Sequence, residues 1–431
     1  MSARKVRSLL PPVFWQIVIA LIVFSSSNAG YYADQSYSDF IDKGWYTASS
    51  EESPVNPLSI WGTVGSIVCV GILLLRIPRR VPPLIQIILP VQIWLVTSAT
   101  WSYTFGPTLF LSLKTIVYAN ALSCSIAELD PPKAIRAFTL SIAAILLVSL
   151  YLCVTDPIFT ASIGADGWRG LFPQKNRLSS FCLFSGLILL LGMRFSPILS
   201  GGTLVLLLFM LTMSQGKAAI GIMSLALLTV ICFTLAMRRR RNPKSAMAAL
   251  CLTFLMIFII SWAIVLYQID RGMLTFTGRT KLWAWFLQDL GDYILVGKGG
   301  LTAPTDPVFV RRAVAHGVPV TSDSSYVMIL YNNGIVGLLL FYYTAIQICV
   351  KSVKTNSQHF IYPIIGIFCY VLFAGTESDT RFLFYYSTYS VLALYAIATK
   401  LVRGDRTERL GRGINAGEMP SRYVSPAQPQ V

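Results

Sequence analysis

The sequence predicts an all-α polytopic membrane protein, and its composition and long uncharged runs lead to this fold class. Of the 431 residues, 55% are hydrophobic and only 13% are charged, and the mean hydropathy is +0.63. A soluble domain carries about 25% charged residues, so this chain lacks the polar residues needed to cover its apolar surface in water. About 18–20 apolar residues span a bilayer as a helix. These features exclude a soluble enzyme, a disordered protein and a disulfide-rich secreted domain.

About twelve transmembrane helices are predicted from run length and absence of charge. They are expected near residues 9–25, 58–75, 84–100, 107–127, 138–154, 178–193, 197–213, 218–237, 246–267, 325–350, 360–375 and 382–399. Residues 1–402 would form the bundle, including a large outer loop at 268–323. The charged, Gly- and Pro-containing tail at 403–431 is expected to be disordered.

The distribution of charge predicts the orientation of these helices. Lys and Arg number 35 and Asp and Glu 19, which gives a net charge of +16. The predicted loops on one side carry most of the basic residues, as expected for the cytoplasmic side. Both termini fall on that side. The positive charge is therefore a matter of topology, and a nucleic-acid partner has no support.

The first predicted helix has a second interpretation. Arg4, Lys5 and Arg7 precede a short apolar run that ends in Ser-Ser-Ser-Asn-Ala-Gly, a pattern also typical of a cleavable signal sequence. We expect a retained helix, because the run from Leu9 to Phe24 approaches spanning length. The rest of the topology is the same in both cases.

Three outer segments are long enough to carry function: Tyr31–Pro57, Thr155–Arg177 and Gln268–Asp323. Long loops in compact proteins are commonly lids or binding segments. The third contains TGRTKLWAWFLQDLGDY (residues 277–293), which is aromatic-rich and moderately amphipathic. It is expected either to lie along the membrane surface or to pack on the bundle.

The sequence lacks the motifs of several kinds of enzyme and transport protein. The chain has no GxxxxGK[ST] phosphate loop, which a nucleotide-driven pump requires. None of the eight cysteines forms a CxxC pair, and the two histidines, His316 and His359, are far apart. A zinc site or a disulfide framework is therefore not indicated. A Ser-His-Asp hydrolase has no support from the sequence.

Basic and polar residues remain as candidates on the outer face. They are Arg169, Lys175, Asn176, Arg177, Lys217, Arg271, Arg279, Arg311 and Arg312. Each alone is compatible with a solvated charge, but together they form a cationic rim suited to a membrane-bound diphosphate. Lys114 falls inside a predicted span, about 10 Å below its outer end at 1.5 Å per residue. An ionisable residue at that depth is a functional candidate, and the alternative is a lysine that snorkels to the surface.

At these positions the sequence resembles a known family. WSYTFGPTLFLSLK (101–114), GLFPQKNRLS (170–179), SQGKAAI (214–220), TGRTKLW (277–283) and SDSSYVMILYNNGIVGL (322–338) occur in that order, and TES (376–378) precedes the last span. They are similar to successive motifs of the O-antigen ligase and polymerase family, which includes exopolysaccharide polymerases. The resemblance implies a GT-C-like membrane glycosyltransferase of the bacterial inner membrane. It also implies periplasmic chemistry without metal, nucleotide sugar or other cofactor.

The resemblance suggests roles for individual residues. Lys114, Lys217 and Arg279 occupy positions where the family usually has Arg, and would bind the diphosphate of the donor. Lysine at two of these positions keeps the charge but loses bidentate geometry. The remaining expected substrate contacts are Arg169, Lys175 and Asn176 at the cavity mouth, and Tyr326 and Glu377 toward the sugar.

The predicted catalytic base departs from the ligase pattern. Ligases of the family place a His-Asn pair eleven residues before the first glycine of a GIVG-like motif; counting back from Gly334 reaches Asp323. An aspartate can accept the proton of a sugar hydroxyl if its pKa is raised. Asp323 also stands where an N-cap residue would begin the next helix. His316 is either a displaced base or an ordinary loop residue.

The leading hypothesis is a polymerase of oligosaccharide repeat units carried on undecaprenyl diphosphate, making exopolysaccharide or O-antigen. Flippase, export and chain-length proteins are further possible partners. The alternatives are the ligase of the same family and, from another class, a secondary transporter of a glycan or organic anion. Transporters often contain inverted repeats with broken helices, and no such repeat is visible in the sequence.

Overall fold

A computed structural model describes residues 11–27, 83–102, 105–156, 161–162, 165–172, 175–239, 279–299, 324–355, 357–376 and 386–417. The α-helices in these ranges are α1 (Pro12–Ser26), α5 (Pro83–Ser98), α6 (Phe105–Glu128), α7 (Pro131–Thr155), α8 (Lys175–Gly192), α9 (Pro197–Met213), α10 (Lys217–Arg239), α12 (Arg279–Leu290), α15 (Ser325–Thr355), α16 (Ile361–Thr376) and α17 (Tyr386–Gly417). Short 3-10 helices are η1 (Ala99–Trp101), η4 (Gly291–Ile294) and η5 (Gln358–Phe360). One small hairpin pairs β1 (Ala161–Ser162) with β2 (Ala165–Asp166), antiparallel with Ala161 opposite Asp166.

The helices agree with the predicted spans wherever the structure describes them. The predicted spans at 58–75 and 246–267 lie outside the described residues, and each of the others overlaps a helix. Among the described residues, six helical stretches are long and apolar enough to cross a membrane: Leu84–Trp101, Thr108–Glu128, Pro131–Thr155, Lys217–Thr234, Ser325–Thr355 and Gln358–Gly375. The all-helical membrane class is thus supported, while twelve spans and a GT-C-like architecture stay predictions.

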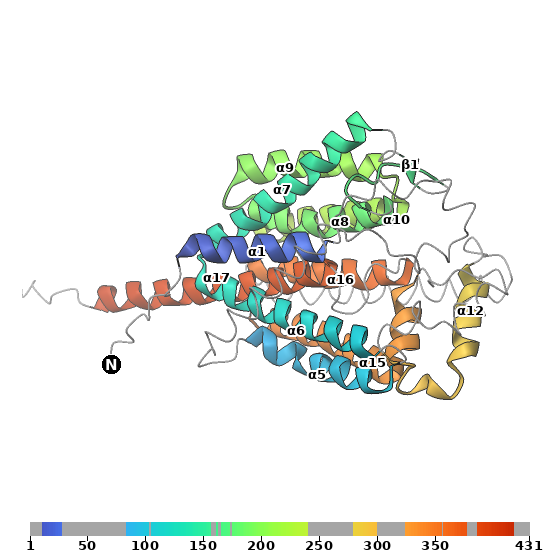
Figure 1. The fold of residues 1–431 in the computed structure, drawn as a ribbon. Helices are drawn as coiled ribbons and strands as arrows, with labels where there is room; N and C mark the ends of the chain where they lie inside the picture. Colours follow the sequence, from blue (N-terminus) through green and yellow to red (C-terminus); the bar gives the residue numbers. More distant parts are fainter. Residues whose placement is uncertain are drawn as a thin grey trace, which may run out of the picture.

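The bundle has two distinct ends. In Figure 1, the start of α1 and the C-terminal part of α17 lie at one end, and α12 and β1 lie at the other, which we call the outer end. At the end that holds the termini, Arg194 Nη1 lies 3.3 Å from His359 Nδ1, which joins the α8–α9 turn to η5. There the ammonium of Lys400 also donates to the carbonyl oxygens of Ile126 and Ala127 at the end of α6. These contacts connect turns that the charge pattern predicts to lie on the cytoplasmic side.

The C-terminal segment differs from expectation. A disordered tail was expected from residue 403, but α17 continues as helix to Gly417. Asp405 with Arg409, and Glu408 with Arg412, are spaced four residues apart, the spacing at which opposite charges stabilise a helix. The predicted disorder is therefore wrong for residues 403–417, because charge alone does not prevent helix formation. Residues 418–431 lie outside the described part of the chain.

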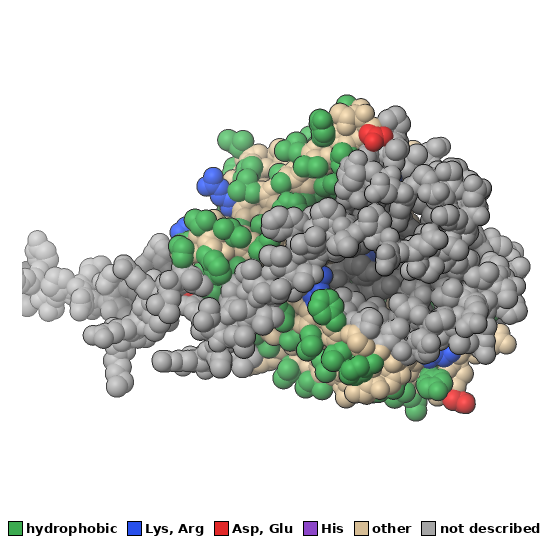
Figure 2. All heavy atoms as spheres, viewed as in Figure 1, with side chains coloured by type: hydrophobic (Ala, Val, Ile, Leu, Met, Phe, Trp, Pro, Cys, Tyr) green, Lys and Arg blue, Asp and Glu red, His purple; other side chains and the backbone are tan. Residues whose placement is uncertain are grey.

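The core centres on α8, whose sides are nearly all buried. It packs against α7, α9, α10, α16 and α17, so it is surrounded by other helices. Large apolar side chains face outward on the surrounding helices; they include Leu147, Val154, Ile198, Val205 and Leu228. Figure 2 shows such side chains spread over the flanks of the bundle. A hydrophobic exterior of this kind is compatible with lipid rather than water as the solvent.

Helix α15 bends sharply at one glycine. Gly334 has φ 67° and ψ −171°, so residues 325–333 and 335–355 are separate helical segments that continue in different directions. The segment before Gly334 packs against α12 through Met328 and Tyr331. In Figure 1, α12 runs across the direction of the bundle helices at the outer end. The bend thus brings the first part of α15 together with α12 at that end.

Candidate functional site

Three segments from two distant parts of the sequence meet at the outer end of the bundle. They are residues 167–172, the start of α8, and the turn between α9 and α10. The backbone N–H of Trp168 donates to the carbonyl oxygen of Met213 over 3.0 Å. The hydroxyls of Ser179 and Ser214 lie 2.8 Å apart. The backbone segments that carry the predicted outer-face residues between 169 and 217 are therefore in contact.

Two glycines permit this close packing. Gly170 has φ +55°, and a Cβ at this position would lie 2.5 Å from the Cβ of Ser149 on α7. The hydroxyl of Ser149 accepts a hydrogen bond from the N–H of Leu171 over 3.3 Å. A Cβ on Gly167 would lie 2.7 Å from the carbonyl oxygen of Ser214. Glycine is required where backbone approaches this closely in a left-handed conformation.

Arg169 is buried within this packing. It lies near Cys153 and Asp156 at the end of α7. Burial lowers the pKa of Arg169, and the nearby Cys153 and Asp156 act in the opposite direction. A guanidinium remains protonated under such a shift. Arg169 was expected to line the cavity mouth; the structure places it beneath the surface, where it contributes positive charge that solvent screens weakly.

The first turns of α8 and α10 add further positive charge. Lys175, Asn176 and Arg177 begin α8 and are half-buried, and Lys217 begins α10 and is exposed. Neither first turn contains an acidic residue. The first N–H groups of a helix have no intrahelical acceptor, and the helix dipole makes this end positive. We call Arg169, Lys175, Arg177 and Lys217 the cationic cluster; its composition suits an anion such as a phosphate group.

α8 and α10 pack against each other and against α16, so the cationic cluster rests on the rigid centre of the bundle. A bound anion would therefore meet donors with fixed positions.

Lys114 lies within α6, nine residues after its first residue Phe105, or about 13 Å along the axis at 1.5 Å per residue. Its side chain is half-buried, and Nζ lies 5.3 Å from the centroid of the Tyr118 ring. The hydroxyl of Tyr118 is 2.5 Å from that of Ser25 on α1, and its ring is 6.0 Å from that of Tyr389 on α17. Lys114 is thus held by a cation–π contact inside the bundle.

Tyr326 lies in the core where α15 meets α16. Its hydroxyl donates to the carbonyl oxygen of Val371 over 2.5 Å. Its ring packs on Phe341 at 5.9 Å and on Tyr342 at 6.0 Å, both beyond the bend of α15. These contacts help to fix the bend of α15, and the contact with sugar predicted for Tyr326 stays a prediction.

A second polar group, which no sequence pattern singled out, lies on the outer loop. Lys298 Nζ lies 2.5 Å from Asp289 Oδ2, and the Tyr331 hydroxyl donates to the same oxygen over 2.7 Å. The ammonium also lies 5.3 Å from the centroid of the Tyr331 ring. We call Asp289, Lys298 and Tyr331 the Asp289 cluster. It joins α12 and the residues after η4 to the first part of α15.

Backbone contacts surround the Asp289 cluster. The N–H of Lys298 donates to the carbonyl oxygen of Tyr331 over 2.9 Å, and Trp101 Nε1 donates to the carbonyl oxygen of Gly297 over 3.2 Å. Gly297 and Gly334 both have positive φ and pack against the opposing backbone. The GKGG and NNG sequences were therefore the available signal, since closely spaced glycines mark close backbone approach.

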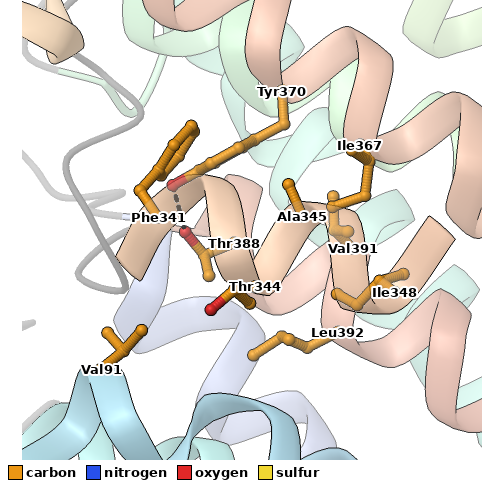
Figure 3. Close-up of a pocket in the computed structure, with 10 residues that line it drawn as sticks. All are labelled: Val91, Phe341, Thr344, Ala345, Ile348, Ile367, Tyr370, Thr388, Val391 and Leu392. Carbon is orange, nitrogen blue, oxygen red and sulfur yellow. Dashed lines mark hydrogen bonds between the residues drawn. The ribbon is translucent and has the colours of Figure 1, made fainter. Parts of the chain in front are cut away.

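An apolar cavity lies deeper in the bundle, between α5, α15, α16 and α17 (Figure 3). The space between its lining residues is about 400 Å³ and is partly open to the outside. Its lining residues are Val91, Phe341, Thr344, Ala345, Ile348, Ile367, Tyr370, Thr388, Val391 and Leu392. The hydroxyls of Tyr370 and Thr388 lie 2.9 Å apart and satisfy each other. None of these lining residues is charged, so the cavity suits hydrocarbon and offers nothing to bind a diphosphate.

Several predicted site residues cannot be placed. Asp323, Glu377, Arg271, Arg311, Arg312 and His316 lie outside the residues that the structure describes. Arg279 is the first residue of α12, but its side chain is outside the described set. Among the described residues, Arg169, Lys175, Asn176 and Lys217 therefore lie on backbone segments that contact one another. Lys114 and Tyr326 make their contacts elsewhere in the bundle.

A model of a known protein family matches part of this chain. Residues 202–342 match the family model described as O-antigen ligase. The matched segment runs from α9 past the bend of α15, and so includes Lys217, α12 and the Asp289 cluster. It confirms the family resemblance over this part of the chain. A search of curated proteins found no match.

Proposed function

We propose that this chain polymerises oligosaccharide repeat units carried on undecaprenyl diphosphate, at the periplasmic face of the bacterial inner membrane. The family match supports a membrane enzyme that acts on lipid-linked glycans. The observation that carries the finer proposal is the cationic cluster. The backbone segments that carry its four basic residues meet at the outer end, and the first turns of α8 and α10 contain no acidic residue.

In the proposed reaction, a hydroxyl oxygen of the acceptor glycan attacks the anomeric carbon of the donor sugar. The bond from that carbon to the phosphate oxygen breaks, and undecaprenyl diphosphate leaves with the bonding electron pair. Negative charge grows on the leaving diphosphate, so fixed positive groups stabilise the transition state more than the ground state. Lys175, Arg177 and Lys217 would supply this stabilisation, with Arg169 adding charge from beneath.

The remaining roles rest on the family resemblance. Asp323 would take the proton from the attacking hydroxyl, and Arg279 and Lys114 would bind the diphosphate. Asn176 and Glu377 would contact the substrate. Tyr326 would help to hold the bend of α15, because its hydroxyl donates to Val371, and its contact with sugar stays a prediction.

The apolar cavity also supports this proposal, because the donor carries a hydrocarbon chain as well as a diphosphate. A lipid-linked donor presents a charged diphosphate and a long hydrocarbon chain to the same protein. The outer end supplies basic groups and the bundle interior supplies an uncharged lining (Figure 3). Hydrocarbon prefers such a lining because no polar group must be desolvated without a partner.

Analysis of undecaprenyl-linked glycans by mass spectrometry, in a strain that lacks the chain, tests the proposal. Accumulation of single repeat units without longer chains is the expected result. Long lipid-linked chains that never reach an acceptor would identify the ligase instead. An unchanged lipid-linked pool would contradict both and favour the transporter.

Complementation of that strain tests the cationic cluster. Lys175→Ala combined with Lys217→Ala is expected to lower polymerisation about a hundredfold, the usual scale for losing transition-state charge stabilisation. Lys217→Arg keeps the charge and should retain activity. Lys133→Ala is the matched control, because Lys133 is exposed at the start of α7 and pairs with Asp130 over 3.5 Å. Equal activity of the double variant and the control would remove the cluster from the mechanism.

A further inference from the structure

Five large apolar side chains are exposed on the outward side of α12 and η4. They are Leu287, Tyr293, Ile294, Leu295 and Val296, which we call the outer apolar patch. Leu295 is 61% exposed and Tyr293 is 53% exposed. Single exposed apolar residues are normal on proteins, but a contiguous group marks an interaction surface.

The patch is held firmly in place by the opposite side of the same segment. Phe286 and Leu290 of α12 are fully buried against Met328 and Tyr331 of α15. The Asp289 cluster adds an ion pair to this contact. The N–H of Val336 donates to the carbonyl oxygen of Leu295 over 3.2 Å, so the backbone of the patch is itself bonded to the bend of α15. The exposure of the patch is therefore a fixed feature of the fold.

The patch lies level with the outer end of a candidate transmembrane helix. Trp101 ends the apolar stretch Leu84–Trp101, and its indole N–H donates to Gly297, the residue after Val296. Ile93, on the same stretch, is an exposed apolar residue eight positions earlier, about 12 Å along a helix at 1.5 Å per residue. Since the hydrocarbon core of a bilayer is about 30 Å thick, the patch falls near its outer boundary.

We propose that the outer apolar patch is embedded in the headgroup region of the outer leaflet and anchors α12 on the membrane. α12 lies across the bundle direction and so parallel to the expected membrane plane (Figure 1). The two elements to which this segment is bonded also carry exposed apolar side chains, Ile93 on α5 and Leu339 on α15. A tyrosine within it and the exposed Asp292 beside it match the mixed character of membrane interfaces.

Electron paramagnetic resonance of the full chain in lipid nanodiscs tests this proposal without any measurement of activity. A spin label is placed at Leu295→Cys, and at Gln288→Cys as the control, since Gln288 is an exposed polar residue of α12. Both variants carry Cys232→Ser, because Cys232 is an exposed native thiol. The labelled parent without a new cysteine gives the background. Oxygen reports contact with lipid, and a nickel chelate reports contact with water.

The label at Leu295 is expected to be severalfold less accessible to the nickel chelate than the label at Gln288, and more accessible to oxygen. Ile294→Cys should behave as Leu295→Cys does, which guards against a local disturbance at one position. Equal access of the nickel chelate at Leu295 and Gln288 would overturn the anchor. Protection of Leu295 from both reagents would also overturn it, since that result indicates a covering protein surface in place of lipid.

Discussion

Replacing Lys298 with methionine tests how the outer loop is attached to the bend of α15. The side chain of Asp289 is 8% exposed and that of Lys298 is 20% exposed, so the pair is largely removed from solvent. Methionine keeps most of the length of lysine but leaves the Asp289 carboxylate without the ammonium. The Tyr331 hydroxyl, 2.7 Å away, continues to donate to that carboxylate. The substitution therefore isolates the contribution of one charge.

The expected magnitude follows from this burial. Breaking a buried ion pair by removing one partner costs about 3–5 kcal/mol, and an exposed pair contributes about 0–1 kcal/mol. Partial exposure of Lys298 and the remaining bond from Tyr331 place the expected loss at about 2–3 kcal/mol, between these limits. Because about 1.4 kcal/mol corresponds to a factor of ten, local opening should become about a hundredfold more frequent.

Hydrogen exchange read by mass spectrometry in nanodiscs measures this opening. The informative amides are Gly297, bonded to Tyr293, and Lys298, bonded to Tyr331. Lys133→Met is the matched control, because the Lys133–Asp130 pair is mostly exposed, at 52% and 72%. Exchange that is unchanged in Lys298→Met, or that rises equally in Lys133→Met, would refute the reasoning. Adding Asp289→Asn should cost less in the double variant than the sum of the two single losses.

Two glycine substitutions give further predictions. Gly170→Ala places a Cβ 2.5 Å from that of Ser149 at a positive φ, so we expect a loss of about 1–3 kcal/mol, seen as a lower thermal midpoint. Gly221→Ala within α10 is the control, because nothing lies within 4 Å of the new Cβ, and it should not lower the midpoint. Gly334→Ala is expected to destabilise the bend of α15, because its Cβ would meet the backbone of Leu295 at a positive φ; faster exchange at residues 295–299 would show this, and unchanged exchange would contradict it.

The helices could be predicted because length and absence of charge decide which segments cross a bilayer. The bend of α15 could not, since residues 325–350 form one run without charge and Gly334 is compatible with a straight helix. Its left-handed φ follows only from the contact with Leu295, which is distant in sequence. The helical extension through residue 417 was missed because the charged composition was given more weight than the spacing of Asp405 and Arg409.

The candidate site was predictable in location more than in detail. Strict alternation of spans placed Lys175 and Lys217 on one face, and the packing of α8 on α10 agrees with this. The alternation of spans does not predict how deeply a side chain is buried. The burial of Arg169 and the hydrogen bond from Tyr326 to Val371 could therefore not be predicted from the sequence. The Asp289 cluster joins part of the long outer loop to α15; the glycines of GKGG and NNG indicate close backbone approach, but they do not identify which segments meet.

The two groups of charged residues at the outer end differ in how they are supported, and this difference bears on mechanism. Lys175 begins α8, the most enclosed helix of the bundle, so the cationic cluster is carried by its most rigid part. The Asp289 cluster instead connects a surface segment to a bend. A site that stabilises a leaving diphosphate needs fixed charges, because charges that must move to meet the transition state lose part of their effect. Among the described elements, α12 packs mainly on α15 and η4, so a change in α12 need not disturb those charges. We therefore expect the charges on α8 and α10 to make the largest contribution to diphosphate binding, with Arg279 and Lys114 adding to it, and we expect access of the lipid-linked substrate to depend on the rest of α12.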